Sequence, residues 1–202
     1  MPAVKRNPDN GFHAASVVKI VTNGHGSVKI TNHLLIRKKC MEAIVAVYSD
    51  WGIGDGNTQP VTVRADRAHF SSLTKGAAVI LGRKTMEDFP GGRPLKGRNN
   101  IVLTRSGADI QDAETARSTE EALKLADKYE KCFVIGGASV FEQFYPYLDR
   151  VYITKIGCAP ESKRFFPNLD EEEDWECTDA GEELEEDGLK FRFCTYERIK
   201  GV

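Results

Sequence analysis

Five short apolar runs, separated by stretches with helical character, constrain the fold of this chain more than any other feature. The runs are Glu42–Tyr48, Ala77–Leu81, Asn100–Thr104, Cys132–Ile135 and Val151–Ile156. They are rich in Val, Ile and Leu and alternate little, which is typical of strands that are buried on both faces. Strands that alternate with helices form a mostly parallel sheet, with helices on both faces and right-handed crossovers. We therefore predict an α/β fold of this kind.

Two local signals refine the prediction. Ser118-Thr119-Glu120-Glu121 is a capping box, and the apolar residues of the ALKLADKY stretch that it opens fall on one helical face. Near the C-terminus, Asp187-Gly188 separates two strand-like segments, which is the signal for a hairpin with a type I′ turn. The sheet is therefore predicted to end in an antiparallel edge.

The first 40 residues differ from the rest of the chain. They carry seven Lys and Arg residues against a single acid, Asp9. A nucleic-acid arm or a targeting sequence would also be basic, but the segment lacks the pattern of aromatic residues interleaved with charges that nucleic-acid binding favours. We predict that residues 1–40 are a basic N-terminal extension of unknown role, extended or weakly ordered. A domain of residues 41–202, which begins with Met41, is expected to be complete by itself.

Composition excludes several classes of protein. A hydrophobic content of 41% is enough for a core, and no apolar run approaches the roughly 20 residues that span a bilayer. Because no signal-peptide pattern is present, we expect a soluble, cytoplasmic protein without a membrane partner. The five cysteines are widely spaced and include no C-x-x-C pair, which argues against a disulfide framework and against a structural zinc site.

Three of the predicted strands are followed by groups that suit phosphates. In open α/β sheets, ligands bind beyond the carboxyl ends of the strands. Cationic side chains, hydroxyl groups and free backbone N–H groups at three such ends match a ligand with several phosphates. These segments are Gly82-Arg83-Lys84-Thr85, Thr104-Arg105 and Gly136-Gly137-Ala138-Ser139. The cations favour a 2′-phosphate, so NADPH is the predicted cofactor. The alternative is that Arg83 and Arg105 only cap helices or pair with surface acids.

A carboxylate stands in the apolar face of a second predicted helix. On a helix, Asp66, Phe70 and Leu73 share one face. A buried acid must be paired or must have a raised pKa, which suits it to recognise or protonate a nitrogen heterocycle near neutral pH. The alternative is an exposed Asp that interacts favourably with the helix dipole. His69 lies beside it, but no second His or Cys supports a metal site, and none is predicted.

Together these residues resemble the dihydrofolate reductase family over almost all of residues 41–200. The motifs that carry the resemblance are WGIGDGN-x-x-P in 51–60, Asp66 with Phe70, GRKTMED in 82–88, GRPLKGRNNIVLT in 92–104, VIGGASVFEQF in 134–144, VYITKI in 151–156 and FFPNL…W in 165–175. The resemblance implies the three-layer fold of that family. It also implies a monomeric enzyme that uses NADPH to reduce 7,8-dihydrofolate to tetrahydrofolate for one-carbon metabolism, with hydride going to C6 and a proton from water to N5. No nucleic acid is expected as a partner.

The resemblance also implies roles for single residues. Asp66 would be the sole ionisable group at the pterin, held by Thr154, and Arg98 would bind the α-carboxylate of the glutamate tail. The substrate would be contacted by Ala46, Asp66, Phe70, Phe89, Leu95, Arg98 and Ile135. The cofactor would be contacted by Ala46, Ile53, Gly54, Gly82, Arg83, Lys84, Thr85, Thr104, Arg105, Ile135, Gly136, Gly137, Ala138, Ser139 and Val140. The double glycine would carry an unusual peptide close to the cofactor.

The chain departs from the family pattern in the loop before Asp66. The family usually has a Trp just after the loop Pro and then Leu-Pro before the catalytic acid, whereas this chain has Pro60-Val61-Thr62-Val63-Arg64. Gln59 and Arg67 stand where apolar side chains are common, and Ala138 replaces a third glycine. These changes concern pterin affinity, loop closure and antifolate sensitivity. Two alternatives remain: an NADPH-dependent reductase of another pterin or pyrimidine intermediate, as in riboflavin synthesis, and a non-catalytic NADPH- or folate-binding module.

Overall fold

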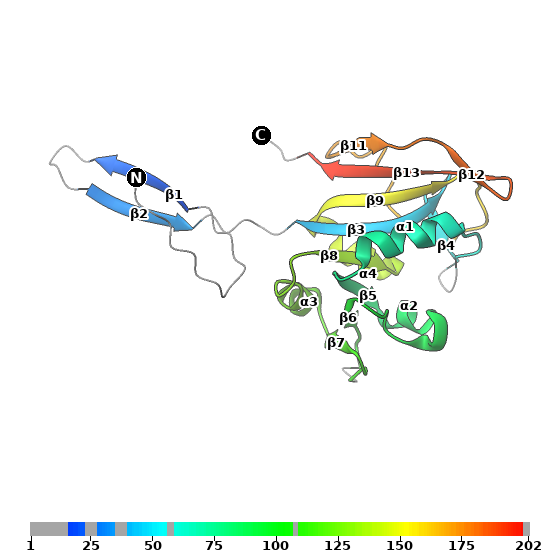
Figure 1. The fold of residues 1–202 in the computed structure, drawn as a ribbon, viewed down its shortest axis with the longest axis horizontal. Coiled ribbons are helices and arrows are strands. Elements are labelled where there is room, and N and C mark those ends of the chain that lie inside the picture. The colour runs from blue at the N-terminus through cyan, green and yellow to red at the C-terminus, as the bar shows by residue number, and fades with distance from the viewer. Residues whose placement is uncertain (1–15, 23–27, 35–39, 56–58, 107–108, 200–202) are drawn as a thin grey trace. The chain divides into compact units, whose positions relative to one another are not determined.

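The computed structural model describes residues 16–22, 28–34, 40–55, 59–106 and 109–199. The chain divides into two compact units, residues 1–39 and 40–202. In the first unit, β1 (Ser16–Thr22) and β2 (Val28–Leu34) pair in an antiparallel sheet (Figure 1). The sequence analysis expected an extended or weakly ordered leader and did not predict this pairing, although both strands contain β-branched residues, which favour strands. The other parts of residues 1–39 lie outside the described residues.

One large sheet forms the centre of the second unit (Figure 1). Its strands, in spatial order, are β11 (Trp175–Ala180), β13 (Leu189–Arg198), β9 (Leu148–Ile156), β3 (Met41–Tyr48), β8 (Cys132–Gly136), β5 (Ala78–Gly82), β6 (Asn99–Leu103) and β7 (Ala113–Ala116). The strands from β9 to β7 are parallel to one another, whereas β13 is antiparallel to each of its partners β9, β11 and β12 (Leu184–Glu186). The prediction of a mostly parallel sheet with an antiparallel C-terminal edge is confirmed.

Helices cover both faces of this sheet. On one face lie α1 (Arg64–Thr74) and α2 (Arg83–Glu87), and on the other lie α3 (Thr119–Ala126) and α4 (Ala138–Phe144). Strand β5 shows why its run is continuously apolar. Val79 packs in the cluster that contains Met86 of α2, while its neighbour Ile80 packs in the cluster of α3 and α4, and both are fully buried. Each layer thus takes alternate residues of the same strand.

Short elements complete the domain. Strand β4 (Gly52–Gly54) pairs with β10 (Arg164–Phe165), and two 3₁₀ turns, η1 (Pro90–Gly92) and η2 (Tyr145–Tyr147), follow α2 and α4. No helix within the described ranges has the length and apolar character to pass through a membrane. Among the same residues, no group of three His, Cys, Asp or Glu side chains is arranged to hold a metal.

The two local signals in the sequence correspond to observed geometry. Ser118 is the N-cap residue of α3, and its hydroxyl accepts a hydrogen bond from the N–H of Glu121 at 3.3 Å. The Glu121 carboxylate accepts a hydrogen bond from the N–H of Arg117 at 2.8 Å, whereas in an ideal capping box it would accept from the N–H of the N-cap residue, Ser118. Asp187 and Gly188 have φ angles of 53° and 79°, so both central residues of the β12–β13 hairpin are left-handed, as a type I′ turn requires.

Candidate active site

Helix α1 places Asp66 against strand β9. The Thr154 hydroxyl, on a residue that is only 1% exposed, donates a hydrogen bond of 2.6 Å to Asp66 Oδ1. Burial raises the pKa of Asp66, while the hydrogen bond from Thr154 and the nearby charges of His69 and Arg67 act in the opposite direction. Asp66 is half-buried, so it does not behave as an exposed Asp at a helix start.

The apolar residues of the same helix anchor it to the sheet. Phe70 and Leu73 pack on Ile44 of β3 and on Phe133 of β8. His69 stacks on Phe193 of β13, with ring centroids 4.2 Å apart and an interplanar angle of 27°. Burial lowers the pKa of His69 and thereby favours the neutral imidazole. Asp66 therefore lies on a helix whose next turn is packed on the centre of the sheet and on its C-terminal edge.

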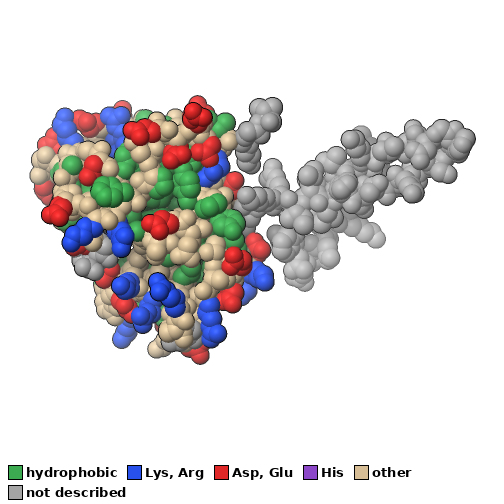
Figure 2. All heavy atoms as spheres, turned by 180° about the vertical axis from the view of Figure 1, so that it is seen from behind, with side chains coloured by type: hydrophobic (Ala, Val, Ile, Leu, Met, Phe, Trp, Pro, Cys, Tyr) green, Lys and Arg blue, Asp and Glu red, His purple; other side chains and the backbone are tan. Residues whose placement is uncertain are grey.

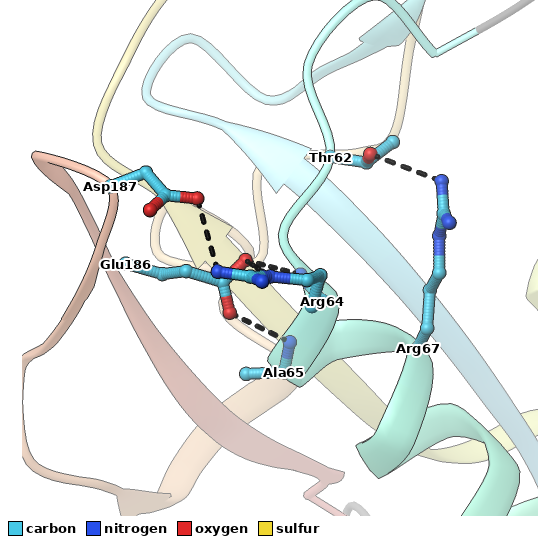
Figure 3. Close-up of polar contacts among 6 residues, drawn as sticks. All are labelled: Thr62, Arg64, Ala65, Arg67, Glu186 and Asp187. Atoms are coloured by element: carbon cyan, nitrogen blue, oxygen red, sulfur yellow. Dashed lines mark hydrogen bonds and ion pairs between the residues drawn. The ribbon is translucent and has the colours of Figure 1, made fainter.

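The first turn of α1 has a cap that comes from a distant part of the chain. The N-cap residue, Val63, forms no side-chain cap hydrogen bond. Instead, the Glu186 carboxylate accepts the N–H of Arg64 at 2.6 Å and the N–H of Ala65 at 3.3 Å (Figure 3). The hydrogen bond from the Arg64 N–H lowers the pKa of Glu186, so this carboxylate stays ionised at neutral pH.

Arg98 is fixed at the other end of α1. Its Nε donates to the Thr74 hydroxyl at 3.2 Å, one terminal nitrogen donates to the Lys96 carbonyl at 2.9 Å, and the other donates to the Ser71 hydroxyl at 3.0 Å. Asp66 and Thr74 are eight residues apart on the helix, which corresponds to about 12 Å along its axis. A carboxylate and a guanidinium thus stand near opposite ends of one helix, an arrangement that suits an elongated ligand.

Two half-buried apolar residues, Phe89 and Leu95, lie between α2 and β6. The backbone of Leu95 is held by Asn100, which is 3% exposed: the Leu95 N–H donates to Asn100 Oδ1 at 3.0 Å and Asn100 Nδ2 donates to the Leu95 carbonyl at 2.9 Å. Asn100 Nδ2 also reaches the Arg98 carbonyl at 3.2 Å. One buried amide therefore fixes the segment that carries both Leu95 and Arg98.

Four residues predicted for the nicotinamide pocket come from three strands of the domain. Ala46 lies on β3, Ile53 and Gly54 on β4, and Ile135 on β8. Ala46 is opposite Thr154 in the β3–β9 ladder, so the predicted cofactor and pterin groups belong to adjacent strands. Gln59 Nε2 donates to the Ala46 carbonyl at 3.4 Å, a contact that the sequence did not reveal.

The chain after Gln59 is also tied to β3. The hydroxyl of Tyr48 accepts the Val61 N–H and donates to the Val61 carbonyl, each at 2.9 Å. Both backbone groups of Val61 are thus satisfied by one side chain. The position where the family usually has Trp is therefore held through its backbone.

Glycines allow two strand ends to come into contact. A Cβ on Gly137 would lie 3.0 Å from Thr85 Oγ1, and a Cβ on Gly82 would lie 3.3 Å from a methyl group of Val140. A side chain at either position would be tight against the neighbouring turn, so Thr85 or Val140 would have to move by a few tenths of an ångström. The Gly136–Gly137 peptide is cis. The turn from β5 to α2 and the turn from β8 to α4 therefore meet beyond the carboxyl ends of these strands.

The predicted phosphate-binding cations lie on the surface near these turns. Arg83 pairs with Glu87 at 3.6 Å, with both side chains about half exposed, as the alternative interpretation of Arg83 expected. An exposed pair of this kind contributes only about 0–1 kcal/mol, so Arg83 can exchange it for an anionic ligand. Lys84 and Arg105 are exposed, and Thr104 forms a 2.9 Å hydrogen bond with Ser106. In Figure 2, Lys and Arg side chains gather over the lower part of the domain, where Figure 1 shows α2, β6 and β7.

The described geometry agrees with what comparison with known proteins shows. The family model described as dihydrofolate reductase matches residues 40–198. The chain belongs to the dihydrofolate reductase family. It is 37% identical to the Bacillus subtilis dihydrofolate reductase over 149 residues, which is 72% of this chain and 87% of that one. It is 37% identical to the Staphylococcus haemolyticus dihydrofolate reductase over 162 residues, which is 78% of this chain and 95% of that one.

A solved structure supports the same conclusion. The Enterococcus faecalis dihydrofolate reductase, complexed with NADP(H) and RAB-propyl, matches with a TM-score of 0.73 and 30% identity, over 81% of this chain and 98% of that chain. The predictions of the family, of its α/β fold and of the enzyme class are therefore confirmed. The chain catalyses the NADPH-dependent reduction of 7,8-dihydrofolate.

Sequence reasoning missed three contributors to the site of this reductase. Asn100 could have been found, because Asn is uncommon in a strand and stands here at the start of an apolar run. Glu186 could not have been found from local pattern, since it caps a helix that begins 122 residues earlier in the chain. The contact of Gln59 with Ala46 was missed because a loop side chain has no periodicity.

Proposed function

We propose that Asp66 and Thr154 form the catalytic pair of this reductase. The observation that carries the proposal is the half-buried Asp66 carboxylate, which accepts a 2.6 Å hydrogen bond from the buried Thr154 hydroxyl. The carboxylate oxygens would accept hydrogen bonds from the amidine edge of the pterin. A carboxylate with a raised pKa favours a protonated substrate near neutral pH, and the proton for N5 would come from water.

The remaining substrate contacts follow from the positions around α1. Phe70, Phe89 and Leu95 would flank the aminobenzoyl group, and Arg98 would bind the α-carboxylate of the tail. Ala46 and Ile135 would lie where the pterin meets the nicotinamide. Support for this arrangement comes from the tethering of Arg98 to Thr74 and Ser71, which orients its guanidinium before any ligand binds.

For the cofactor, we propose that the turns after β5, β6 and β8 hold NADPH. When bound, NADPH supplies the hydride for C6 of the substrate. The solved relative from Enterococcus faecalis is complexed with NADP(H), and the close approach of the turns at Gly82 and Gly137 brings the starts of α2 and α4 together, where a pyrophosphate would bind. Contacts would come from Gly82, Arg83, Lys84, Thr85, Thr104, Arg105, Gly136, Gly137, Ala138, Ser139 and Val140, and at the nicotinamide from Ala46, Ile53, Gly54 and Ile135.

The proposal is tested by following the loss of NADPH absorbance after 7,8-dihydrofolate is added to the purified protein. We expect turnover with dihydrofolate, and no turnover with a pyrimidine intermediate of riboflavin synthesis that lacks a carboxylate tail. Turnover of the pyrimidine alone would contradict the assignment of Arg98. We further propose that the enzyme is a cytoplasmic monomer, which size-exclusion chromatography with light scattering would check for the oligomeric state.

A further inference from the structure

The N-terminus of α1 is stabilised by a residue outside the proposed catalytic pair. The first N–H groups of any helix have no partner within the helix, and an N-cap side chain usually binds one of them. Val63 has no side-chain acceptor. The two oxygens of Glu186 bind the first two N–H groups, those of Arg64 and Ala65, at 2.6 Å and 3.3 Å.

This cap compensates for a departure from the family pattern. Where the family usually has Pro before the catalytic acid, this chain has Arg64. Proline at the first helical position has no N–H to satisfy, whereas Arg64 brings a donor that needs an acceptor. Its guanidinium also contacts Glu186 at 3.4 Å and Asp187 at 3.2 Å, as Figure 3 shows. The substitution and the cap therefore belong together.

The capped turn is the one that contains Asp66. Thr154 on β9 lies opposite Phe193 on β13, and β13 continues through the hairpin turn into β12, which carries Glu186. Glu186 and Thr154 thus belong to one sheet and bind the same helical turn at two points. One contact fixes the backbone at the start of the turn, and the other fixes the Asp66 carboxylate.

We infer that Glu186 is a positioning residue for catalysis, which holds the first turn of α1 so that the Asp66 carboxylate stays against Thr154. The inference rests on the proposed function of Asp66. Without the cap, the first turn frays and water reaches the carboxylate. A cap contributes about 0.5–2 kcal/mol, which corresponds to an approximately 2- to 30-fold change in the ratio of ordered to frayed turn and sets the upper limit of the effect on activity.

The pH dependence of activity should change as well. The charges that act on the Asp66 carboxylate are those of His69 and Arg67 on its own helix, while β9 contributes the neutral Thr154 and β13 the neutral Phe193, which stacks on His69. Loss of the Glu186 cap lets water reach the Asp66 carboxylate, which weakens the effect of burial and so lowers the pKa of Asp66 toward its ordinary value. Wild-type activity should fall as the pH rises, because the proton that the substrate needs becomes scarcer, and this fall should begin at a lower pH in a variant without Glu186.

The test compares Glu186→Ala with Glu185→Ala. Glu185 is the exposed neighbour on the same strand and has no hydrogen bond to α1 among the described contacts, so its variant controls for the loss of one acidic charge. We expect Glu186→Ala to lower kcat/KM for dihydrofolate by 2- to 30-fold, with the KM for NADPH within twofold of wild type. Glu185→Ala should match the wild type in both quantities.

A double-mutant cycle isolates the cap from other effects. Val63 has φ −111° and ψ 143°, the conformation that a residue before proline prefers, so Arg64→Pro fits the backbone. In the Arg64→Pro background, the main donor for Glu186 is gone, and Glu186→Ala should change kcat/KM by less than twofold. If Glu186→Ala alone does not fold, Glu186→Gln replaces it, because the amide oxygen keeps one acceptor and a smaller loss is expected.

Several outcomes would overturn the inference. An active wild type with Glu186 variants within twofold of it at every pH would do so, as would an equal loss in the Arg64→Pro background. A loss of thermal stability with an unchanged pH profile and unchanged kcat/KM would also overturn it, since it would show that the cap is only structural. A wild type without dihydrofolate turnover would instead refute the proposed function.

Discussion

Replacement of Asp66 by Asn tests the proposed catalytic pair most directly. The amide keeps the shape of the side chain and an oxygen that can accept from the Thr154 hydroxyl, but it removes the charge. Loss of general acid–base assistance typically slows the chemical step by 10²–10⁴-fold, which corresponds to about 3–5 kcal/mol in the activation barrier. NADPH binding should be unaffected, because none of the proposed phosphate contacts involves α1.

The same variant should be more stable than the wild type at neutral pH, because the pKa of Asp66 is raised in the folded protein. Burial raises the pKa of Asp66 in the folded protein above its value in the unfolded chain. The group therefore contributes stability below its unfolded pKa, and this contribution is lost as the pH rises through the folded pKa. At neutral pH the ionised carboxylate is a cost to the fold. Asp66→Asn removes this cost, so its melting temperature should exceed that of the wild type at pH 7 and approach it near pH 4.

Two measurements check both halves of this prediction. Pre-steady-state hydride transfer from about pH 5 to 9 should show a loss that shrinks as the pH falls, because solvent then protonates the substrate. Thermal denaturation at pH 7 and pH 4 gives the change in stability. A hydride-transfer rate within threefold of wild type at every pH would refute the catalytic role. Lower stability at pH 7 would identify Asp66 as an ordinary helix-start residue, whose negative charge interacts favourably with the helix dipole.

Three further predictions concern other parts of the chain. Wild type should prefer NADPH over NADH by at least tenfold in KM, which is about the effect of one charge-assisted hydrogen bond. The double variant Arg83→Ala, Arg105→Ala should lose most of this preference. An unchanged preference would contradict the assignment of both residues to the 2′-phosphate. A chain that begins at Met41 should fold and keep its activity, and full loss of soluble protein would show that residues 1–40 are needed for folding. Gly136→Ala should destabilise the protein by about 1–3 kcal/mol in chemical denaturation, because Gly136 has φ 114° and a Cβ would lie 3.1 Å from the Phe141 ring; Gly97→Ala, with open space around it, is the milder comparison.

The positions of the strands, and their burial between two layers of helices, could be predicted because each apolar run is a local feature of the sequence. A continuous apolar run such as Ala77–Leu81 can be satisfied only between two covering layers, and the structure places β5 there with a shift of one residue. The C-terminal hairpin followed from Asp187-Gly188, since few residues other than Asn, Asp and Gly accept two consecutive left-handed conformations. Pairing of β1 with β2 was missed, although Asn23-Gly24 between them is a hairpin signal in the sequence.

The candidate site divides in the same way. Asp66 was visible in the sequence as a carboxylate in an apolar stripe, but its partner Thr154 came only from the family resemblance, because the two residues are 88 positions apart. Glu186 was hidden for the same reason among the many acids of the C-terminal segment. Contacts that tertiary structure creates between distant segments leave no periodic signal in one sequence.

The position of β3 in the sheet determines when it can find its partner strands during synthesis of the chain. It is the first strand of the reductase domain, yet it lies inside the sheet, where Ala43 pairs with Val134 of β8 on one side and with Val151 of β9 on the other. During synthesis, neither partner exists until most of the chain has left the ribosome. Contacts between such distant segments make folding slow and leave an apolar strand exposed to wrong partners in the meantime. The nascent chain is therefore expected to depend on chaperones until β9 emerges, and slowed translation before Val151 should increase its aggregation.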